Sequence, residues 1–223
     1  MARQPVCVVG LVAMVLSAAA TARAADGDIS SVMSSISVNA GENRGNLSTV
    51  NGSIRVGEGA TVGLAHTVNG SITLESRATA AEAKTVNGSV HLNDGAHVNG
   101  PVHSVNGSLA LAQGADVSGM LANVNGSIRV GAAHVGGDVE TVTGSIEIGP
   151  DAHVDGGVIV RKDRSDDTSS RGEPKVVIGP GSVVKGPLKF ERPVRLYISD
   201  HATTGAIEGA TATTFSGQSP PNK

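Results

Sequence analysis

The chain has 223 residues, with 17 Lys or Arg, 20 Asp or Glu and a formal net charge of −3 at pH 7. This length fits a single domain, and a mildly acidic chain without a basic block disfavours nucleic acid as a partner. Aromatic residues number only three, two Phe and one Tyr. Because a core of ordinary shape uses several aromatic side chains to fill its volume, we expect a narrow core of small and β-branched residues.

The first 24 residues are typical of a secretory signal peptide. Arg3 supplies a positive start, an apolar run follows over about residues 6 to 20, and Ala22-Arg23-Ala24 has the small-x-small pattern of a cleavage site. The apolar run is too short to favour spanning a bilayer, and no later stretch is long enough to do so. We therefore expect export to the periplasm, the outer-envelope surface or the extracellular space.

Cleavage after residue 24 would change the chemistry of the chain. It would remove Arg3 and Arg23, leaving 15 basic and 20 acidic residues and a net charge of −5. It would also remove Cys7, which is the only cysteine. The mature protein is then expected to contain no disulfide and no thiol chemistry.

A six-residue phrase, Thr49-Val50-Asn51-Gly52-Ser53-Ile54 in its first full form, recurs along the chain. Its central positions are Asn51, Asn69, Asn87, Asn106, Asn125 and Thr143. The steps between them are 18, 18, 19, 19 and 18 residues. A nearly fixed step of this length indicates a stack of repeats, each contacting its neighbours in sequence.

Apolar and polar residues alternate through each repeat, which predicts short strands with one buried face. Counting from Val50, this alternation assigns one set to the inward face: Val50, Gly52, Ile54, Val56, Ala60, Val62, Leu64 and Val68. By the same count Val105 and Ile128 point inward, so Asp at either should unfold a middle section. Helix is disfavoured by this period and by 30 glycines.

Asn-Gly between apolar segments is also a strong hairpin signal, so a meander of hairpins is an alternative. In a two-residue hairpin Val50 and Ser53 would be partners on one face, which places a hydroxyl beside each core valine. A bend without reversal keeps Val50 and Ile54 together on the inward face. The pattern therefore favours a solenoid over hairpins.

Eighteen residues divide into three sixes, which suggests three short strands and three corners per coil, with coils about 4.8 Å apart. We predict an all-β, single-domain, three-sided β-solenoid over residues 25–215, with 18 to 19 residues per coil and eight or nine coils. The coils begin near Val32 and continue to about Ile159. A charged insertion at about 161–174 interrupts them, and the rhythm resumes at 177–182.

The end of the chain differs from the repeats. Residues 194–198 hold the largest side chains (Val-Arg-Leu-Tyr-Ile), and terminal coils of solenoids are atypical because they close the core. We therefore interpret residues 194–198 as a C-terminal cap. Residues 216–223 are predicted to be a disordered tail.

The recurring Thr-Val-Asn-Gly-Ser-Ile phrase, the Gly-Ala-x-Val-x-Gly phrase at 95–100 and 114–119, and Ile178-Gly179-Pro180-Gly181 resemble two groups of proteins. One is the secreted bacterial adhesin family built from Val-x-Gly-x-Ile β-repeats. The other is the bactofilins, whose triangular β-helices stack end to end into filaments. The resemblance covers about residues 31–210. Bactofilins are typically cytosolic, so the secretory signal brings this chain closer to the secreted group, which implies an envelope-associated structural or adhesive role.

Stacked coils place equivalent residues in columns. One column follows the inward alanine: Thr61, Thr79, His97, Asp116, His134 and His153. The last four would lie on successive coils, close enough for neighbours to share a metal ion; the alternative is a solvated column at a corner. We assign no metal, catalytic or cofactor residue from the sequence.

The asparagines form a second column, in which stacked amides would bond along the axis. Each also begins an Asn-Gly-Ser glycosylation sequon, which we treat as a by-product of the turn phrase. Thr49, Thr67 and Thr85 form a third column, predicted to face outward, where regular threonines could match an ice lattice or simply favour strand and water.

A polysaccharide-acting β-helix enzyme needs paired carboxylates or a basic residue in a cleft. Charged candidates cluster only in the insertion: Arg161, Lys162, Asp163, Arg164, Asp166, Asp167, Arg171 and Glu173. Such mixed-charge loops are usually solvated and flexible. We expect a non-catalytic structural or adhesin-like element of the envelope, with a self-polymerising scaffold as the alternative, and with other copies of itself or envelope components as partners.

Overall fold

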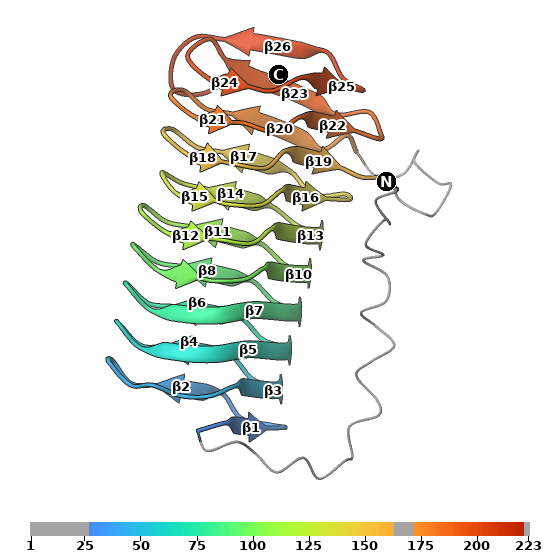
Figure 1. Ribbon diagram of the computed structural model, residues 1–223. Helices are drawn as coiled ribbons and strands as arrows, with labels where there is room; N and C mark the ends of the chain where they lie inside the picture. Colours follow the sequence, from blue (N-terminus) through green and yellow to red (C-terminus); the bar gives the residue numbers. More distant parts are fainter. Residues whose placement is uncertain (1–26, 163–171, 221–223) are drawn as a thin grey trace, which may run out of the picture.

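The computed structural model describes residues 27–162 and 172–220. Figure 1 shows parallel strands stacked along one axis, from β1 and β2 at the N-terminal end to β24, β25 and β26 at the other. The described part contains 26 strands and no helix. These described residues include no helix that is long and apolar enough to cross a membrane.

The strands of successive coils lie on three sides of the stack. The second side is a ten-stranded sheet, sheet B, and ten strands correspond to about nine turns of the described chain. Its strands are β2 (Ile36–Val38), β4 (Ile54–Val56), β6 (Ile72–Leu74), β8 (Val90–Leu92), β11 (Leu109–Leu111), β14 (Ile128–Val130), β17 (Ile146–Ile148), β20 (Lys175–Ile178), β23 (Arg195–Ser199) and β26 (Ala212–Phe215).

The first and third sides form a 16-stranded sheet, sheet A. The first side contains β1 (Ile29–Ser31), β3 (Leu47–Asn51), β10 (Val102–Asn106), β13 (Leu121–Asn125), β16 (Val139–Thr141), β19 (Val158–Val160), β22 (Leu188–Phe190) and β25 (Ile207–Glu208). The third contains β9 (His97–Val98), β12 (Asp116–Val117), β15 (His134–Val135), β18 (His153–Val154), β21 (Val183–Val184) and β24 (Thr203–Thr204). Two long strands, β5 (Thr61–Asn69) and β7 (Thr79–Asn87), continue from the third side into the first.

The register follows the sequence repeat. Asn51 pairs with Asn69, and Ile54 pairs with Ile72, each one coil apart, and the pairings are parallel. A chain of hairpins would pair antiparallel strands. The solenoid prediction is therefore confirmed, and the hairpin alternative is wrong.

The core is narrow and built from small and branched side chains, as expected. Sheet B supplies one fully buried column: Ile54, Ile72, Val90, Leu109, Ile128 and Ile146, each exposed by 1% or less. Alanines fill the column at the next corner, from Ala60 through Ala152. Continuous burial of these columns supplies the main apolar stabilisation of such a stack.

The predicted inward face is wrong for part of each coil. Ile54, Val56, Ala60 and Val62 are buried as expected, but Val50 is 38% exposed and Leu64, Val68 and Val105 are only half-buried. Thr49, Thr67 and Thr85 are buried instead, exposed by 1%, 0% and 0%.

The physical reason is a change of phase at two corners. Thr49 and Ile54 both point inward although they are five residues apart, because the corner at 51–53 turns the chain and breaks the alternation. A second change separates Val62 from Ala65, which are both buried and three residues apart. Period-two counting holds only within a straight strand.

The buried hydroxyls bond to the corner of the preceding coil. Thr49 donates to the carbonyl of Ser34 (3.0 Å) and Thr67 to that of Gly52 (2.8 Å). Ser104 and Asn123 take the same place farther along, donating to Gly88 (2.9 Å) and Gly107 (2.7 Å). The buried hydroxyls are acceptable inside the core because their hydrogen bonds are made, whereas Asn123 pairs only its Nδ2 and leaves its Oδ1 buried without a partner. The threonines do not face outward, so the ice-lattice hypothesis is wrong.

The corner glycines stack too closely for any side chain. A Cβ built on Gly70, Gly88 or Gly107 would overlap the carbonyl oxygen of the glycine one coil earlier. Glycine is needed here for close backbone approach rather than for a turn conformation. The glycine of the Asn-Gly-Ser phrase is therefore required by the stacking distance at this corner.

The stack resumes after the charged insertion with the predicted spacing, because Ile148 pairs with Ile178, thirty residues later. Residues 163–171 lie outside the described residues. The predicted cap is wrong, because β23 is followed by a further coil and Leu196 pairs with Ala212 of β26. This last, threonine-rich coil is held by backbone pairing and by apolar contacts, because Phe215 is buried and Ala202, Ala210 and Ala212 pack against the core. Residues 216–220 follow β26 without a strand, and 221–223 lie outside the described range.

Candidate functional site

The histidine and aspartate column is the main cluster of ionisable side chains that recurs from coil to coil. His97 pairs with Asp116, Asp116 with His134, and His134 with His153, each on the next strand of the third side. The sequence prediction that these four residues lie on successive coils is confirmed. We call this column the acid–base ladder.

Contacts in the acid–base ladder alternate between base and acid. The Nδ1 atom of His97 lies 2.5 Å from a carboxylate oxygen of Asp116, whose other oxygen contacts Nδ1 of His134. Nε2 of His134 lies 3.1 Å from Asp155, which pairs with the Nζ of Lys185 at 2.7 Å. The ladder thus ends with Asp155 and Lys185, whereas the ring of His153 contacts the carbonyl of Asp151 (3.2 Å).

The two carboxylates change the acid–base behaviour of His134. Its hydrogen bonds with Asp116 and then Asp155 raise the pKa of His134 above the usual 6.5. The hydrogen bond with Lys185, followed by the one with His134, lowers the pKa of Asp155 below the usual 3.8. Both shifts favour the charged forms, so His134 and Asp155 support each other as an ion pair.

A hollow of about 430 Å³ lies beside the acid–base ladder. Its polar lining comes from Asp116, His134, Asp151, His153, Asp155 and Lys185. Within residues 27–162 and 172–220, no group of three or more His, Cys, Asp or Glu side chains is placed to hold a metal ion. The ring nitrogens and carboxylates contact one another instead.

The asparagine column forms the predicted amide ladder. The Nδ2 of Asn69 donates to Oδ1 of Asn51, and the same bond, 2.9 Å long, repeats from Asn87 to Asn69, Asn106 to Asn87 and Asn125 to Asn106. Thr143 continues the column by donating to Asn125 (2.5 Å). Because each bond joins equivalent residues of adjacent coils, the ladder holds the corners in register.

The outer surface of the first side carries a second set of ionisable groups. His66, Lys84 and His103 pair in one column across β5, β7 and β10. Burial, and then the charge of Lys84, lowers the pKa of both His66 and His103. The half-buried valines 68, 86 and 105 form the next column. The ammonium of Lys84 lies 2.6 Å from the Glu82 carboxylate, so this surface combines half-buried valines with a histidine pair and one lysine–glutamate ion pair.

Glu140 is a charged side chain of β16 that is only 3% exposed. Its carboxylate binds Arg161, through Nε and through an Nη2 bond of 2.9 Å, and Arg161 also lies 4.0 Å from Glu191. The hydrogen bond to Glu140 raises the pKa of Arg161 further. The start of the charged insertion is therefore docked on the stack. Of the other insertion residues, 163, 164, 166, 167 and 171 lie outside the described ranges.

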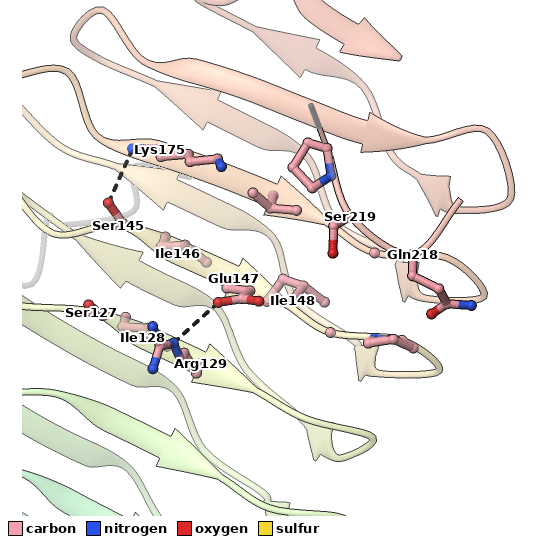
Figure 2. Close-up of a pocket in the computed structure, with 15 residues that line it drawn as sticks. Ser127, Ile128, Arg129, Ser145, Ile146, Glu147, Ile148, Lys175, Gln218 and Ser219 are labelled. Atoms are coloured by element: carbon pink, nitrogen blue, oxygen red, sulfur yellow. Dashed lines mark hydrogen bonds and ion pairs between the residues drawn. The ribbon is translucent and has the colours of Figure 1, made fainter. Parts of the chain in front are cut away.

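A groove of about 450 Å³ crosses the outer face of sheet B between β14, β17 and β20 and residues 218–220 (Figure 2). Arg129 and Glu147 face each other on adjacent strands, with 3.2 Å between Nε and Oε2. The ammonium of Lys175 lies 5.3 Å from the ring centre of Tyr197, within cation–π range. This groove, the tail groove, combines the cationic side chains of Arg129 and Lys175 with the Glu147 carboxylate and the corner residues Ser127 and Ser145.

No protein-family model, curated protein or solved structure matches the chain.

Sequence reasoning located the asparagine and acid–base ladders but missed several functional candidates. Asp155 follows His153 by two residues, so strand alternation places both on the same face. This spacing could have predicted Asp155 as a member of the ladder. Lys185 joins only because the chain returns after the insertion, with Val154 pairing with Val184. The tail groove depends on where residues 218–220 fold back, and no sequence pattern indicates that.

Proposed function

We propose that the protein is a non-catalytic, exported structural or adhesin-like β-solenoid of the bacterial cell envelope that acts through its lateral surface. The observation that supports this role best is the continuity of the side-chain ladders. Asn51 through Asn125 bond in an unbroken series, which gives a rod with a regular, rigid lateral surface. Solenoids commonly present such extended surfaces to partners.

The proposal of a non-catalytic role is supported by how the ionisable groups are used. A general acid or base must be free to exchange a proton with substrate. His97, Asp116 and His134 contact one another along the axis instead. Asp116→Asn and Asp155→Asn variants should keep any envelope binding of the parent protein; loss of a polysaccharide-cleaving activity in them would instead establish an enzyme.

Export is the first part to test. The full chain is expressed in a bacterium, the periplasmic, membrane and extracellular fractions are separated, and the N-terminus of the recovered protein is determined by mass spectrometry. We expect an exported protein that begins at Ala25. A cytoplasmic protein that retains Met1 would contradict the proposed location.

Lateral binding is then measured by co-sedimentation of the purified protein with two probes, isolated peptidoglycan and outer-membrane vesicles from the same bacterium. Binding to either supports an envelope role. Two charge-reversal variants identify the contacting face. One is Arg129→Glu with Lys175→Glu in the tail groove, and the other is Lys84→Glu on the first side. No retention on either probe would contradict the adhesive role.

A self-polymerising scaffold is the alternative, and the last coil favours it. Strands β24 and β26 are the outer strands of their sheets, and Ile207 of β25 is 39% exposed. Unpaired strand edges can pair with another chain. Light scattering over a concentration series, with negative-stain electron microscopy, distinguishes the two roles: filaments support the scaffold, and a constant monomer mass supports a lateral role.

A further inference from the structure

The first coil differs from the later coils at two inward positions. The Thr61 amide donates to the carbonyl of Glu42 (2.9 Å), as the Thr79 amide donates to that of Ala60 (2.8 Å). Glu42 is therefore the first-coil counterpart of Ala60. Asn43 pairs with Thr61, so Arg44 is the counterpart of Val62.

In the later coils these two positions hold small or branched uncharged residues. The column of Glu42 continues as Ala60, Ala78, Ala96, Ala115, Ala133, Ala152 and Ser182, and that of Arg44 as Val62, Ala80, Val98, Val117, Val135, Val154 and Val184. All of these residues are exposed by 5% or less. A carboxylate and a guanidinium thus lie over the two columns at the N-terminal end of the core.

The two charges are held in place. Arg44 Nη2 lies 3.4 Å from Glu42 Oε2, and the backbone amide and the Nδ2 of Asn39 each donate to the Glu42 carboxylate at 3.2 Å. The Asn39 side-chain bond is the main reason that the pKa of Glu42 lies below its usual value. The side chains of Arg44 and Glu42 are 42% and 34% exposed, so water still solvates both.

We infer that the Glu42–Arg44 ion pair closes the N-terminal end of the solenoid against a second copy of this chain. The surface that would stack there is the last coil, where Ala202 and Thr204 occupy the same two columns without charge. Stacking would bury Glu42 and Arg44 and remove their water, which is unfavourable even for a paired carboxylate and guanidinium. Inward-pointing charges are a general means of preventing edge association.

The test converts the first coil to the residues of the second. The full chain and a Glu42→Ala/Arg44→Val double variant are purified, and their weight-average masses are measured by light scattering and sedimentation velocity over a concentration series. We expect the unmodified chain to stay monomeric. The double variant should at least double its mass with increasing concentration and form rods longer than one molecule in negative stain.

Two control variants separate the position of the charges from their number. Glu58→Ala/Arg77→Ala removes an ion pair of the same composition from the lateral surface, where these side chains are 55% and 74% exposed. Glu42→Arg/Arg44→Glu keeps both charges at the end but exchanges them. We expect both controls to remain monomeric.

The inference is overturned if the Glu42→Ala/Arg44→Val variant, with the circular dichroism spectrum of the parent, remains monomeric at every concentration. It is equally overturned if the exchanged pair associates as strongly as the double variant. End-to-end filaments of the unmodified chain would also contradict it. A variant that loses its β spectrum is replaced by Glu42→Gln/Arg44→Gln, for which association is again expected.

Discussion

The hydroxyl of Thr85 donates a 2.9 Å hydrogen bond to the carbonyl of Gly70, fifteen residues earlier in the chain. Thr85 is fully buried, and it lies one coil after Thr67, which makes the same bond to Gly52. The bond joins the inside of one coil to the corner of the coil before it. The repeated threonine thus stabilises the stack from inside the core, by a hydrogen bond between adjacent coils, and is not part of the outer surface.

Replacement of Thr85 by Val keeps the shape of the side chain but removes this bond. The Gly70 carbonyl then loses a buried partner, and we expect the free energy of unfolding to fall by about 1–3 kcal/mol. Urea unfolding followed by circular dichroism measures the change. Thr73→Val, on the outer face of β6, is the control and should lower the free energy of unfolding less. Equal losses in the two variants would argue against a stabilising role for the Thr85 hydrogen bond.

Gly88→Ala should be more damaging. The new Cβ would overlap the carbonyl oxygen of Gly70, and backbone pairing on both sides prevents the corner from moving away. We expect a loss of more than about 2 kcal/mol, seen as a lower thermal midpoint. Gly172→Ala is the matched control, because no atom lies within 4 Å of its added Cβ; a stable Gly88→Ala protein would show that the corners can separate.

Asp substitutions at Ile128 and Val105 should differ sharply, although the alternation of the sequence alone makes them equivalent. Ile128 is fully buried in β14, so Ile128→Asp places a carboxylate in an apolar core and should unfold the middle coils. Val105 points outward, so Val105→Asp should cost about 1 kcal/mol, mainly through β-propensity. Limited proteolysis compares them, and comparable cleavage of both variants would contradict the assignment of faces.

The acid–base ladder should make stability depend on pH. The pKa of His134 is raised by Asp116 and Asp155, so its contribution is fully present below its unfolded pKa of about 6.5 and is lost as the pH rises through the higher folded value. His134→Gln should therefore lose more stability at pH 6 than at pH 9. The difference between variant and parent is measured by urea unfolding, which cancels the opposite effect of His66 and His103.

His153→Gln is the control for that experiment. It removes the next histidine of the column, whose ring contacts a backbone carbonyl rather than a carboxylate. We expect a much smaller pH-dependent difference for this variant. If His134→Gln and His153→Gln show the same pH dependence, the carboxylate contacts of His134 are not responsible.

The spacing of the repeated phrase determined the architecture. In a parallel, in-register stack, residues 18 or 19 apart must be neighbours, so the sequence alone predicts the columns. The asparagine ladder and the order His97, Asp116, His134 follow from that arithmetic, and both are present. Both ladders join equivalent residues of adjacent coils, so the repeat spacing is enough to predict them.

The tertiary structure decided which way side chains point near the corners and what meets beyond one repeat. Thr85 faces inward because the backbone changes phase at a corner whose geometry depends on the coil below it. Arg161 covers Glu140, 21 residues earlier, because the chain leaves the stack at that point. Glu42 and Arg44 occupy core columns in the first coil that the structure describes, and their side chains remain 34% and 42% exposed. These outcomes depend on where the stack turns and ends, which a periodic sequence does not specify.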